Sequence, residues 1–346
     1  MAAYTTVDDA GSVYNTVLYT STGSTMNITG AGFQPDFTWI KARDENVKHL
    51  WFDSVRGVTK YLQSNDSAVE VTAADTLTAF DSDGYTIGTS ADLNNATELY
   101  VSWNWKLGTT SGLTGGTITP TSYSFNATSG VGIYAYNGTG ATGTITHGLG
   151  AVPKFMLNKR YEEGEGAQEW KVYGAQESMG ATKFMVLDQQ DIPSVRTDIW
   201  NDTAPTSTVF TIGSEISTSG VDFVQYVFAE VQGFSKFGQY IGNGNADGTF
   251  VYTGFRPAFF MIKRTDSTNN WWIVDNKRVG YNVDNNILFA DLTQGKDDGN
   301  YVDILSNGLK TRTTDGGLNV LSGTYIYVAF AEAPFANSNG VACNAR

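Results

Sequence analysis

The chain has 346 residues, 41% of them hydrophobic and 13% aromatic, so it can bury sizeable cores and is not generally disordered. Only 16% are charged, and the formal net charge of −13 argues against nucleic acid and against an anionic membrane surface as partners. The single cysteine, Cys343, excludes an intrachain disulfide, and no apolar run is long enough for membrane insertion as a helix.

Residues 1–12 have neither a basic start nor an apolar centre, so they do not read as a signal peptide. We expect them to form an N-terminal arm of a protein that is made in a cytoplasm. The many glycines, with abundant Thr, Ser and Asn, favour short strands joined by tight turns.

One ten-residue pattern, G-x-x-P-x-F-x-x-x-K, occurs three times along the chain. In each copy, apolar residues lie between residues typical of turns, and this pattern predicts a buried strand. A tyrosine that opens a Gly/Asn/Thr-rich stretch precedes each copy, and an aromatic, β-branched run that is apolar on both faces closes each unit. The copies are Gly32–Lys41, Gly150–Lys159 and Gly254–Lys263, the tyrosines Tyr19, Tyr136 and Tyr240, and the closing runs Leu99–Trp103, Phe223–Phe228 and Tyr325–Phe330.

This internal repeat predicts an all-β protein with three tandem units that resemble β-sandwiches or jelly rolls. Helical periodicity is sparse. A packing of the units around a pseudo-threefold axis is our hypothesis for their arrangement. The predicted segments are the arm 1–12, unit 1 at 13–108, a linker at 109–130, unit 2 at 131–232, unit 3 at 236–335 and a C-terminal tail at 336–346.

The units differ at a few polar positions. Asp53 and Arg56 of unit 1 match Asp275 and Arg278 of unit 3, whereas the alignment gives unit 2 Tyr173 in place of the aspartate. Units 2 and 3 end in Phe-Ala-Glu, at Phe228–Glu230 and Phe330–Glu332, where unit 1 is aligned with Trp103–Trp105. The glutamates therefore read as structural.

The sequence gives little support for catalysis. His49 and His147 form no metal-ligand pair, and no nucleophile elbow, P-loop or dinucleotide fingerprint occurs. We expect no enzyme and no cofactor. Asp81 and Asp83 resemble the opening of a calcium loop, but the distal ligands are missing, so a plain turn is favoured over a metal site.

A resemblance to a known family rests on Gly32–Lys41, Asp81–Gly88, Tyr252–Ser267 and Phe330–Phe335. These stretches resemble a repeat-containing protein family of tailed bacteriophages, especially marine ones, and the resemblance covers nearly the whole chain. The resemblance implies a virion structural protein at a tail-fibre or other surface position, with lectin-like β folds, and it carries over no catalytic or ligand residue. Such a protein assembles in the host cytoplasm and leaves by lysis.

Three functions follow as alternatives: a tail-fibre or adhesin component that binds a host-surface glycan or protein, a capsid decoration protein that stabilises the head, and, less favoured, a polysaccharide depolymerase. Partners would be other virion proteins, and a homo-oligomer, in particular a trimer, is expected. The repeated residues are of the types that form strands, turns and cores. Any binding site should therefore lie in the loops that the units do not share, chiefly Tyr161–Gln168 and Thr293–Asn300.

Overall fold

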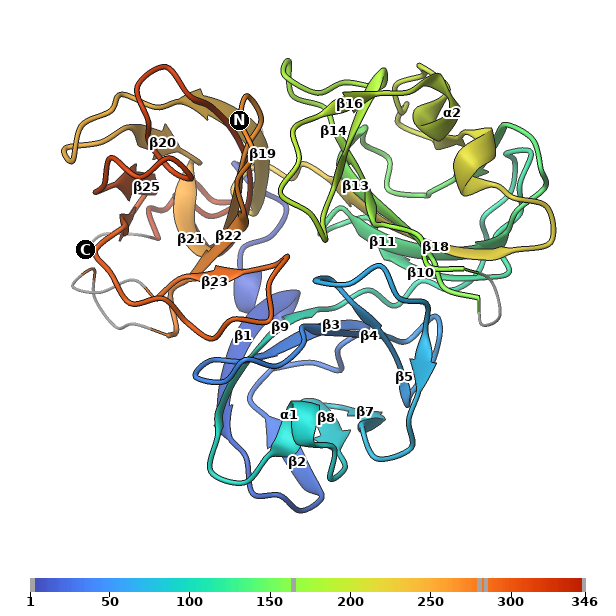
Figure 1. The fold of residues 1–346 in the computed structure, drawn as a ribbon, viewed down its shortest axis with the longest axis horizontal. Helices are drawn as coiled ribbons and strands as arrows, with labels where there is room; N and C mark the ends of the chain where they lie inside the picture. The colour runs from blue at the N-terminus through green and yellow to red at the C-terminus, as the bar shows by residue number, and fades with distance from the viewer. Residues whose placement is uncertain (1–3, 163–165, 279–281, 283–285, 344–346) are drawn as a thin grey trace.

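The computed structural model describes residues 4–162, 166–278, 282 and 286–343, and these consist mainly of antiparallel strands (Figure 1). This confirms the predicted all-β fold class. The helices in the described part are single turns, and none is long and apolar enough to cross a membrane. They are α1 (Ala91–Asn94), α2 (Thr197–Trp200) and the 3₁₀ turns η1 (Ala10–Ser12) and η2 (Ser214–Ile216).

Each unit combines a large sheet with a smaller one. In unit 1 the large sheet has the order β1-β9-β3-β4-β5-β6 and the small sheet the order β2-β8-β7, so the first and last long strands of the unit are neighbours. The strands are β1 (Tyr14–Thr20), β2 (Met26–Thr29), β3 (Phe37–Ala42), β4 (Leu50–Asp53), β5 (Lys60–Gln63), β6 (Val71–Thr72), β7 (Leu77–Asp81), β8 (Gly84–Ile87) and β9 (Leu99–Trp105).

Unit 2 repeats this topology in the order β10-β11-β18-β13-β14-β15-β16, with the small sheet β12-β17. Strand β10 lies in the segment predicted as a linker, so unit 2 begins earlier than residue 131. The strands are β10 (Ser122–Asn126), β11 (Val131–Asn137), β12 (Gly143–Thr146), β13 (Pro153–Arg160), β14 (Lys171–Gly174), β15 (Lys183–Val186), β16 (Ser194–Val195), β17 (Val209–Ile212) and β18 (Asp222–Ala229).

Unit 3 has the order β19-β26-β21-β22-β23 and the small sheet β20-β25-β24. Its last strand is the longest of the chain's described strands. The strands are β19 (Ser235–Ile241), β20 (Phe250–Tyr252), β21 (Phe255–Arg264), β22 (Trp271–Asp275), β23 (Leu288–Phe289), β24 (Val302–Leu305), β25 (Gly308–Thr311) and β26 (Thr324–Pro334).

The strand registers correct two details of the repeat alignment. The phenylalanine of each G-x-x-P-x-F motif faces Trp105, Phe228 or Phe330 on the closing strand. Trp105, and not Trp103, is therefore equivalent to the phenylalanine of Phe-Ala-Glu. On its other side the motif phenylalanine faces Asp53, Gly174 or Asp275, so Gly174, and not Tyr173, replaces the aspartate in unit 2.

One buried hydrophobic cluster takes residues from all three large sheets. Figure 1 shows the three units arranged around a common central axis, which we call the pseudo-threefold axis. Strand β18 divides its side chains between two cores: Val224, Tyr226 and Phe228 face the axis, whereas Phe223 and Val227 face the small sheet of their own unit. Both faces of a large sheet are thus covered, which explains why the closing runs are apolar at successive positions.

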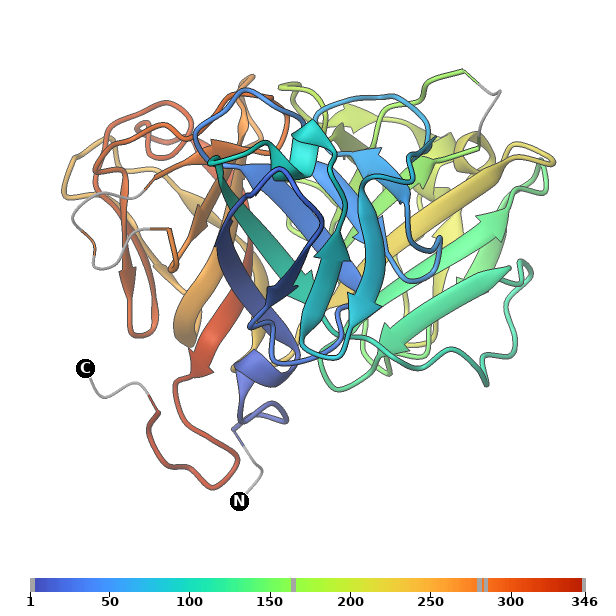
Figure 2. The same ribbon diagram turned by 90° about the horizontal axis from the view of Figure 1, so that it is seen from below.

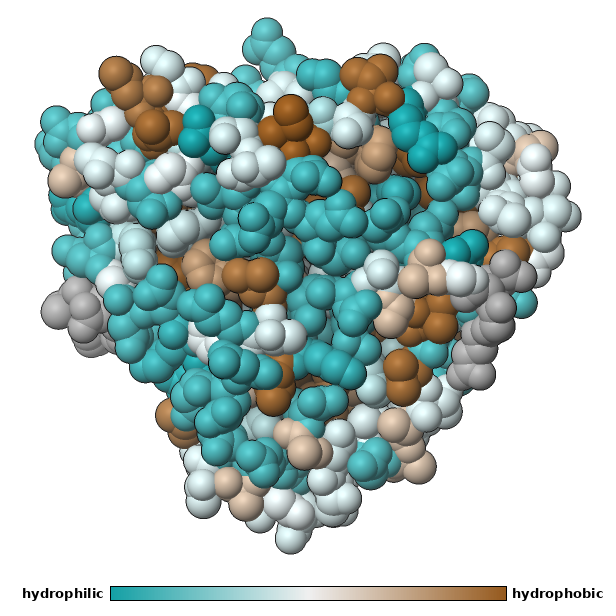
Figure 3. All heavy atoms as spheres, in the orientation of Figure 1, coloured by the Kyte–Doolittle hydropathy of each residue, from teal (hydrophilic) through white to brown (hydrophobic). Residues whose placement is uncertain are grey.

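The described segments next to the two termini lie at one end of this axis, which we call the terminal end (Figure 2). There the N-terminal arm and the C-terminal tail bond to each other, because Asp8 accepts hydrogen bonds from the backbone N–H and the hydroxyl of Ser338, both at 2.6 Å. The opposite end, called the loop end, carries α1 and the β3–β4, β13–β14 and β21–β22 connections. Around the axis this face is largely hydrophilic, with isolated apolar residues (Figure 3).

Candidate functional site

The lysine that ends each repeated motif is buried, and it bonds to backbone carbonyls instead of facing solvent. Lys159 Nζ donates to Ser67 O of unit 1 at 2.6 Å, and Lys263 Nζ donates to Gln190 O of unit 2 at 2.7 Å. Lys41 bonds within its own unit, to Ala42 O and Glu45 O. Burial lowers the pKa of Lys41 to about 7 and those of Lys159 and Lys263 to about 8. These lysines hold the loop-end connections together.

A second repeated contact joins each unit to the one before it in the ring. Trp170 Nε1 donates to Gln63 O at 2.7 Å, and Trp271 Nε1 donates to Val186 O at 2.9 Å. His49 takes this place where unit 1 meets unit 3: it contacts the backbone of Phe289, and its Nε2 makes no hydrogen bond of normal geometry. Burial keeps the pKa of His49 well below its usual value. The three units therefore close into a ring with three seams.

A third repeated contact is a hydrogen bond from the backbone N–H of each of these aromatic residues to a side-chain oxygen. The N–H groups of His49, Trp170 and Trp271 donate to the side-chain oxygens of Asn65, Asp188 and Asp291, at 2.8, 2.9 and 2.9 Å. Unit 1 uses an amide where units 2 and 3 use a carboxyl group. Burial raises the pKa of Asp188 to about 6 and that of Asp291 to about 7, partly offset by these backbone hydrogen bonds.

We expect Asp291→Asn to increase the free energy of unfolding at pH 8 by about 2 kcal/mol. A raised carboxyl pKa means that the folded state binds the proton more tightly than the unfolded state. The contribution of Asp291 to stability is therefore greatest below about pH 4 and declines as the pH rises through about 7. The amide keeps the bond to Trp271, as Asn65 does to His49.

Urea unfolding at pH 4, 6 and 8 measures this effect, with Asp188→Asn as a matched variant of smaller expected gain. The increase in the free energy of unfolding should vanish near pH 4, where the Asp291 carboxyl of the wild type is protonated. An equal increase in unfolding free energy at pH 4 and pH 8 would contradict the assigned role of burial.

The buried lysines change stability with pH in the opposite direction, because their lowered pKa values make the folded state more stable as the pH rises from about 7 to about 10.

Two of the three seams contain a buried ion pair. Arg56 Nε donates to Asp53 Oδ2 at 2.7 Å, and Tyr226 of unit 2 donates to the same oxygen at 2.7 Å. At the seam between units 3 and 1, Asp275 pairs with Arg278 and accepts from Trp103 Nε1 at 3.1 Å. At the seam between units 2 and 3, Gly174 stands at the position of the accepting aspartate, and Val328 stands at the position of the donating Tyr226 or Trp103. Both the hydrogen-bond acceptor and its donor are therefore replaced by residues without a polar side chain.

The loops predicted to carry a binding site contribute to these seams. Tyr161 O accepts from Glu70 N, and Gln168 N donates to Ser67 O; residues 163–165 of that loop lie outside the described residues. In the second loop Lys296 N donates to Arg43 O and Gly295 N donates to the side chain of Asn46. The described parts of both loops are therefore bonded to a neighbouring unit.

The calcium candidates act within a turn at the terminal end. Asp83 accepts from Gly30 N at 3.1 Å and Gly32 N at 2.7 Å, and Asp81 accepts from the Thr86 hydroxyl at 2.7 Å. Among the described residues no three His, Cys, Asp or Glu side chains gather in a way that could hold a metal ion. His147 is likewise bound into its own turn, accepting from Leu149 N at 3.1 Å.

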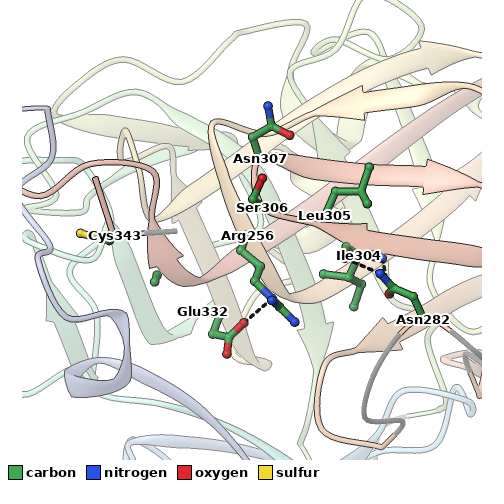
Figure 4. A pocket seen from close by; sticks show the side chains of 9 residues that line it. Arg256, Asn282, Ile304, Leu305, Ser306, Asn307, Glu332 and Cys343 are labelled. Carbon is green, nitrogen blue, oxygen red and sulfur yellow. Dashed lines mark hydrogen bonds and ion pairs between the residues drawn. The ribbon is translucent and has the colours of Figure 1, made fainter. Parts of the chain in front are cut away.

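A cleft of about 630 Å³ lies in unit 3 near the C-terminal tail (Figure 4). Its charged residues, Arg256 and Glu332, form an ion pair with Nε and Oε2 2.6 Å apart. Asn282 bonds to both backbone groups of Ile304. These bonds already engage the side chains of Arg256, Glu332 and Asn282.

A smaller cleft of about 250 Å³ lies at the terminal end, where units 2 and 3 meet. Tyr4 and Tyr252 line it with their aromatic rings, and Tyr252 is 55% exposed. Glu230 and Lys236 line it as well, with Oε1 and Nζ 3.7 Å apart, and both side chains are about one-third exposed. We call this the tyrosine cleft; it combines apolar ring faces with an accessible acceptor and donor.

The outer faces of the three small sheets differ at the same place. Strand β20 reads Phe250-Val251-Tyr252, with the valine buried and both aromatic residues exposed. The corresponding strands read Asn27-Ile28-Thr29 and Thr144-Ile145-Thr146, with the isoleucine buried in each. Sequence reasoning missed this difference, although an alignment of the three units beyond the ten-residue motif would have revealed it.

The family described as a domain of unknown function, DUF7483, matches residues 9–334. The match extends from the N-terminal arm to the last residue of β26 and so covers all three units. No curated protein matches the chain.

Proposed function

The chain belongs to the DUF7483 family over nearly its whole length, and we propose that it is a non-enzymatic structural protein on the surface of a bacteriophage virion, where it acts as a tail-fibre or adhesin component that binds the host surface. One observation carries the proposal. The polar residues that recur in the units are bound within seams and turns, whereas exposed aromatic side chains gather on unit 3, at Phe250 and Tyr252.

This division of roles suits a display protein. A ring closed by buried contacts keeps its outer surface rigid, which reduces the conformational entropy lost when a partner binds. Exposed aromatic residues are enriched in recognition surfaces because they bury a large area with few rotatable bonds. The proposed partners are other virion proteins and a glycan or protein of the host surface.

A capsid decoration protein is the second candidate, and the arms favour it. Residues 4–12 and 335–343 lie together at the terminal end, where they could fasten to a lattice of other virion proteins. A homotrimer remains part of both proposals. Sedimentation of the purified chain at several concentrations tests that oligomeric state.

Electron microscopy of phage particles that carry this chain, labelled with antibodies against it, distinguishes the two candidates. Label on tail fibres, together with inhibition of adsorption by the purified protein, is the expected result. Label on capsomers, with adsorption unchanged by the purified protein, would contradict the adhesin role and favour the role of a capsid decoration protein. Release of reducing ends from host polysaccharide would overturn the non-enzymatic assignment.

A further inference from the structure

We propose that the tyrosine cleft is a carbohydrate-binding site, and that its ligand is a neutral oligosaccharide of hexose or N-acetylhexosamine units. The inference rests on the proposed function, since it assigns a site and a ligand class to the host-binding role. It starts from the residues that distinguish unit 3 from units 1 and 2, Phe250 and Tyr252 on β20, and from Tyr4 of the N-terminal arm, which lines the same cleft as Tyr252.

The two tyrosines provide ring faces of the kind that bind sugars. The CH face of a pyranose is apolar and flat enough to pack on an aromatic ring, whose face carries partial negative charge. Tyr4 and Tyr252 line the same cleft, and Phe250 lies two residues from Tyr252 on the same exposed face of β20. A sugar in the cleft can therefore be followed by a second sugar along the sheet.

The cleft is held in shape before any ligand binds. The Tyr4 hydroxyl donates to Gly254 O at 2.6 Å, and burial beside Tyr252 raises the pKa of Tyr4, so the phenol stays protonated at neutral pH. The Tyr4 ring also lies against Gly233, where a Cβ would come within 3.2 Å of Cε1. A fixed ring loses little entropy on binding.

The polar groups of the cleft favour a neutral ligand. The Glu230 carboxylate can accept hydrogen bonds from sugar hydroxyls, and the Lys236 ammonium can donate to them. At 3.7 Å the two charges balance each other without a close bond, so the cleft has little net charge to attract a uronic acid or a phosphorylated sugar. Gln232 adds an exposed amide at the rim. The volume of about 250 Å³ is below the usual range for drug-sized ligands, about 300–1,000 Å³, which suits one sugar ring of a longer chain.

The test uses the full chain on a printed array of defined neutral and anionic oligosaccharides. Isothermal titration then measures the affinity for the neutral oligosaccharide that gives the strongest signal. Tyr252→Ala should weaken its binding roughly tenfold or more, because the stacking face is lost. Tyr252→Phe, which keeps the ring, should stay within about threefold of the wild type. Leu321→Ala is the control, since Leu321 is 71% exposed and lies outside the cleft.

Thermal unfolding of each variant establishes that it is folded, and the exposure of Tyr252 predicts unchanged stability. Wild-type affinity in Tyr252→Ala, or binding confined to anionic oligosaccharides, would overturn the site or its ligand class. If no oligosaccharide binds while the protein still labels tail fibres and blocks adsorption, this inference fails and the proposed function stands. If the label lies on capsomers, the adhesin role fails, and the titration still decides whether the cleft binds sugar.

Discussion

Asp53→Ala is expected to lower the free energy of unfolding by about 3–5 kcal/mol. The Asp53 carboxylate is fully buried and accepts from Arg56 Nε, Arg56 N and the Tyr226 hydroxyl, at 2.7, 2.8 and 2.7 Å. Its removal leaves a guanidinium in the seam between units 1 and 2 with Glu70 as its remaining carboxylate. Chemical denaturation followed by tryptophan fluorescence measures the loss.

Asp266→Ala is the matched control. Its ion pair with Arg264 has an Nε–Oδ1 distance of 2.6 Å, but the Asp266 side chain is 39% exposed, so the expected change is below about 1 kcal/mol. The seam between units 2 and 3, where Gly174 stands in place of the aspartate, predicts that Asp53→Ala combined with Arg56→Met recovers part of the loss. The guanidinium is then removed as well, and Glu70 keeps its ion pair with Lys60, whose Nζ lies 3.3 Å from Oε1. Equal losses for Asp53→Ala and Asp266→Ala would show that the buried pair does not stabilise the seam.

The repeated units and the β class were predictable because they depend on local patterns. Gly, Pro and Phe at fixed spacing mark a strand entry, and apolar residues on both faces mark a strand covered on both sides. The end of unit 1 was misaligned by two residues because Trp103 and Trp105 both suit a buried strand. The pairing of Trp105 with Phe37 decides the register, and this is a contact between distant parts of the chain.

The candidate site was not predictable in the same way. The loop from Tyr161 to Gln168 is polar and variable, as binding loops often are, yet its ends bond to Glu70 and Ser67 across a seam. Likewise Tyr4 and Tyr252 are 248 positions apart in sequence, and the closure of the ring brings them into one cleft. Sequence periodicity gives the direction of a side chain from its strand but not the neighbour that it meets from another unit.

Phe259→Ala is expected to lower the free energy of unfolding by about 3–5 kcal/mol and to destabilise all three units together. Phe259 is 2% exposed and lies in the shared core. Its ring centroid is 5.6 Å from that of Trp103 and 6.1 Å from that of Phe330, so it contacts both unit 1 and its own closing strand. The truncation leaves a cavity on the axis, where the wild type has one of only about 20 Å³.

Phe250→Ala is the control for this substitution, because Phe250 is 43% exposed and its loss should change the unfolding free energy by less than about 0.5 kcal/mol. Unfolding is followed by tryptophan fluorescence, to which Trp103 of unit 1 and Trp170 of unit 2 contribute, and by circular dichroism of the strands. Because these residues share the core with Phe259, the midpoints from both probes should move together. If part of the signal keeps its wild-type midpoint, the units unfold independently, and the shared core does not couple them.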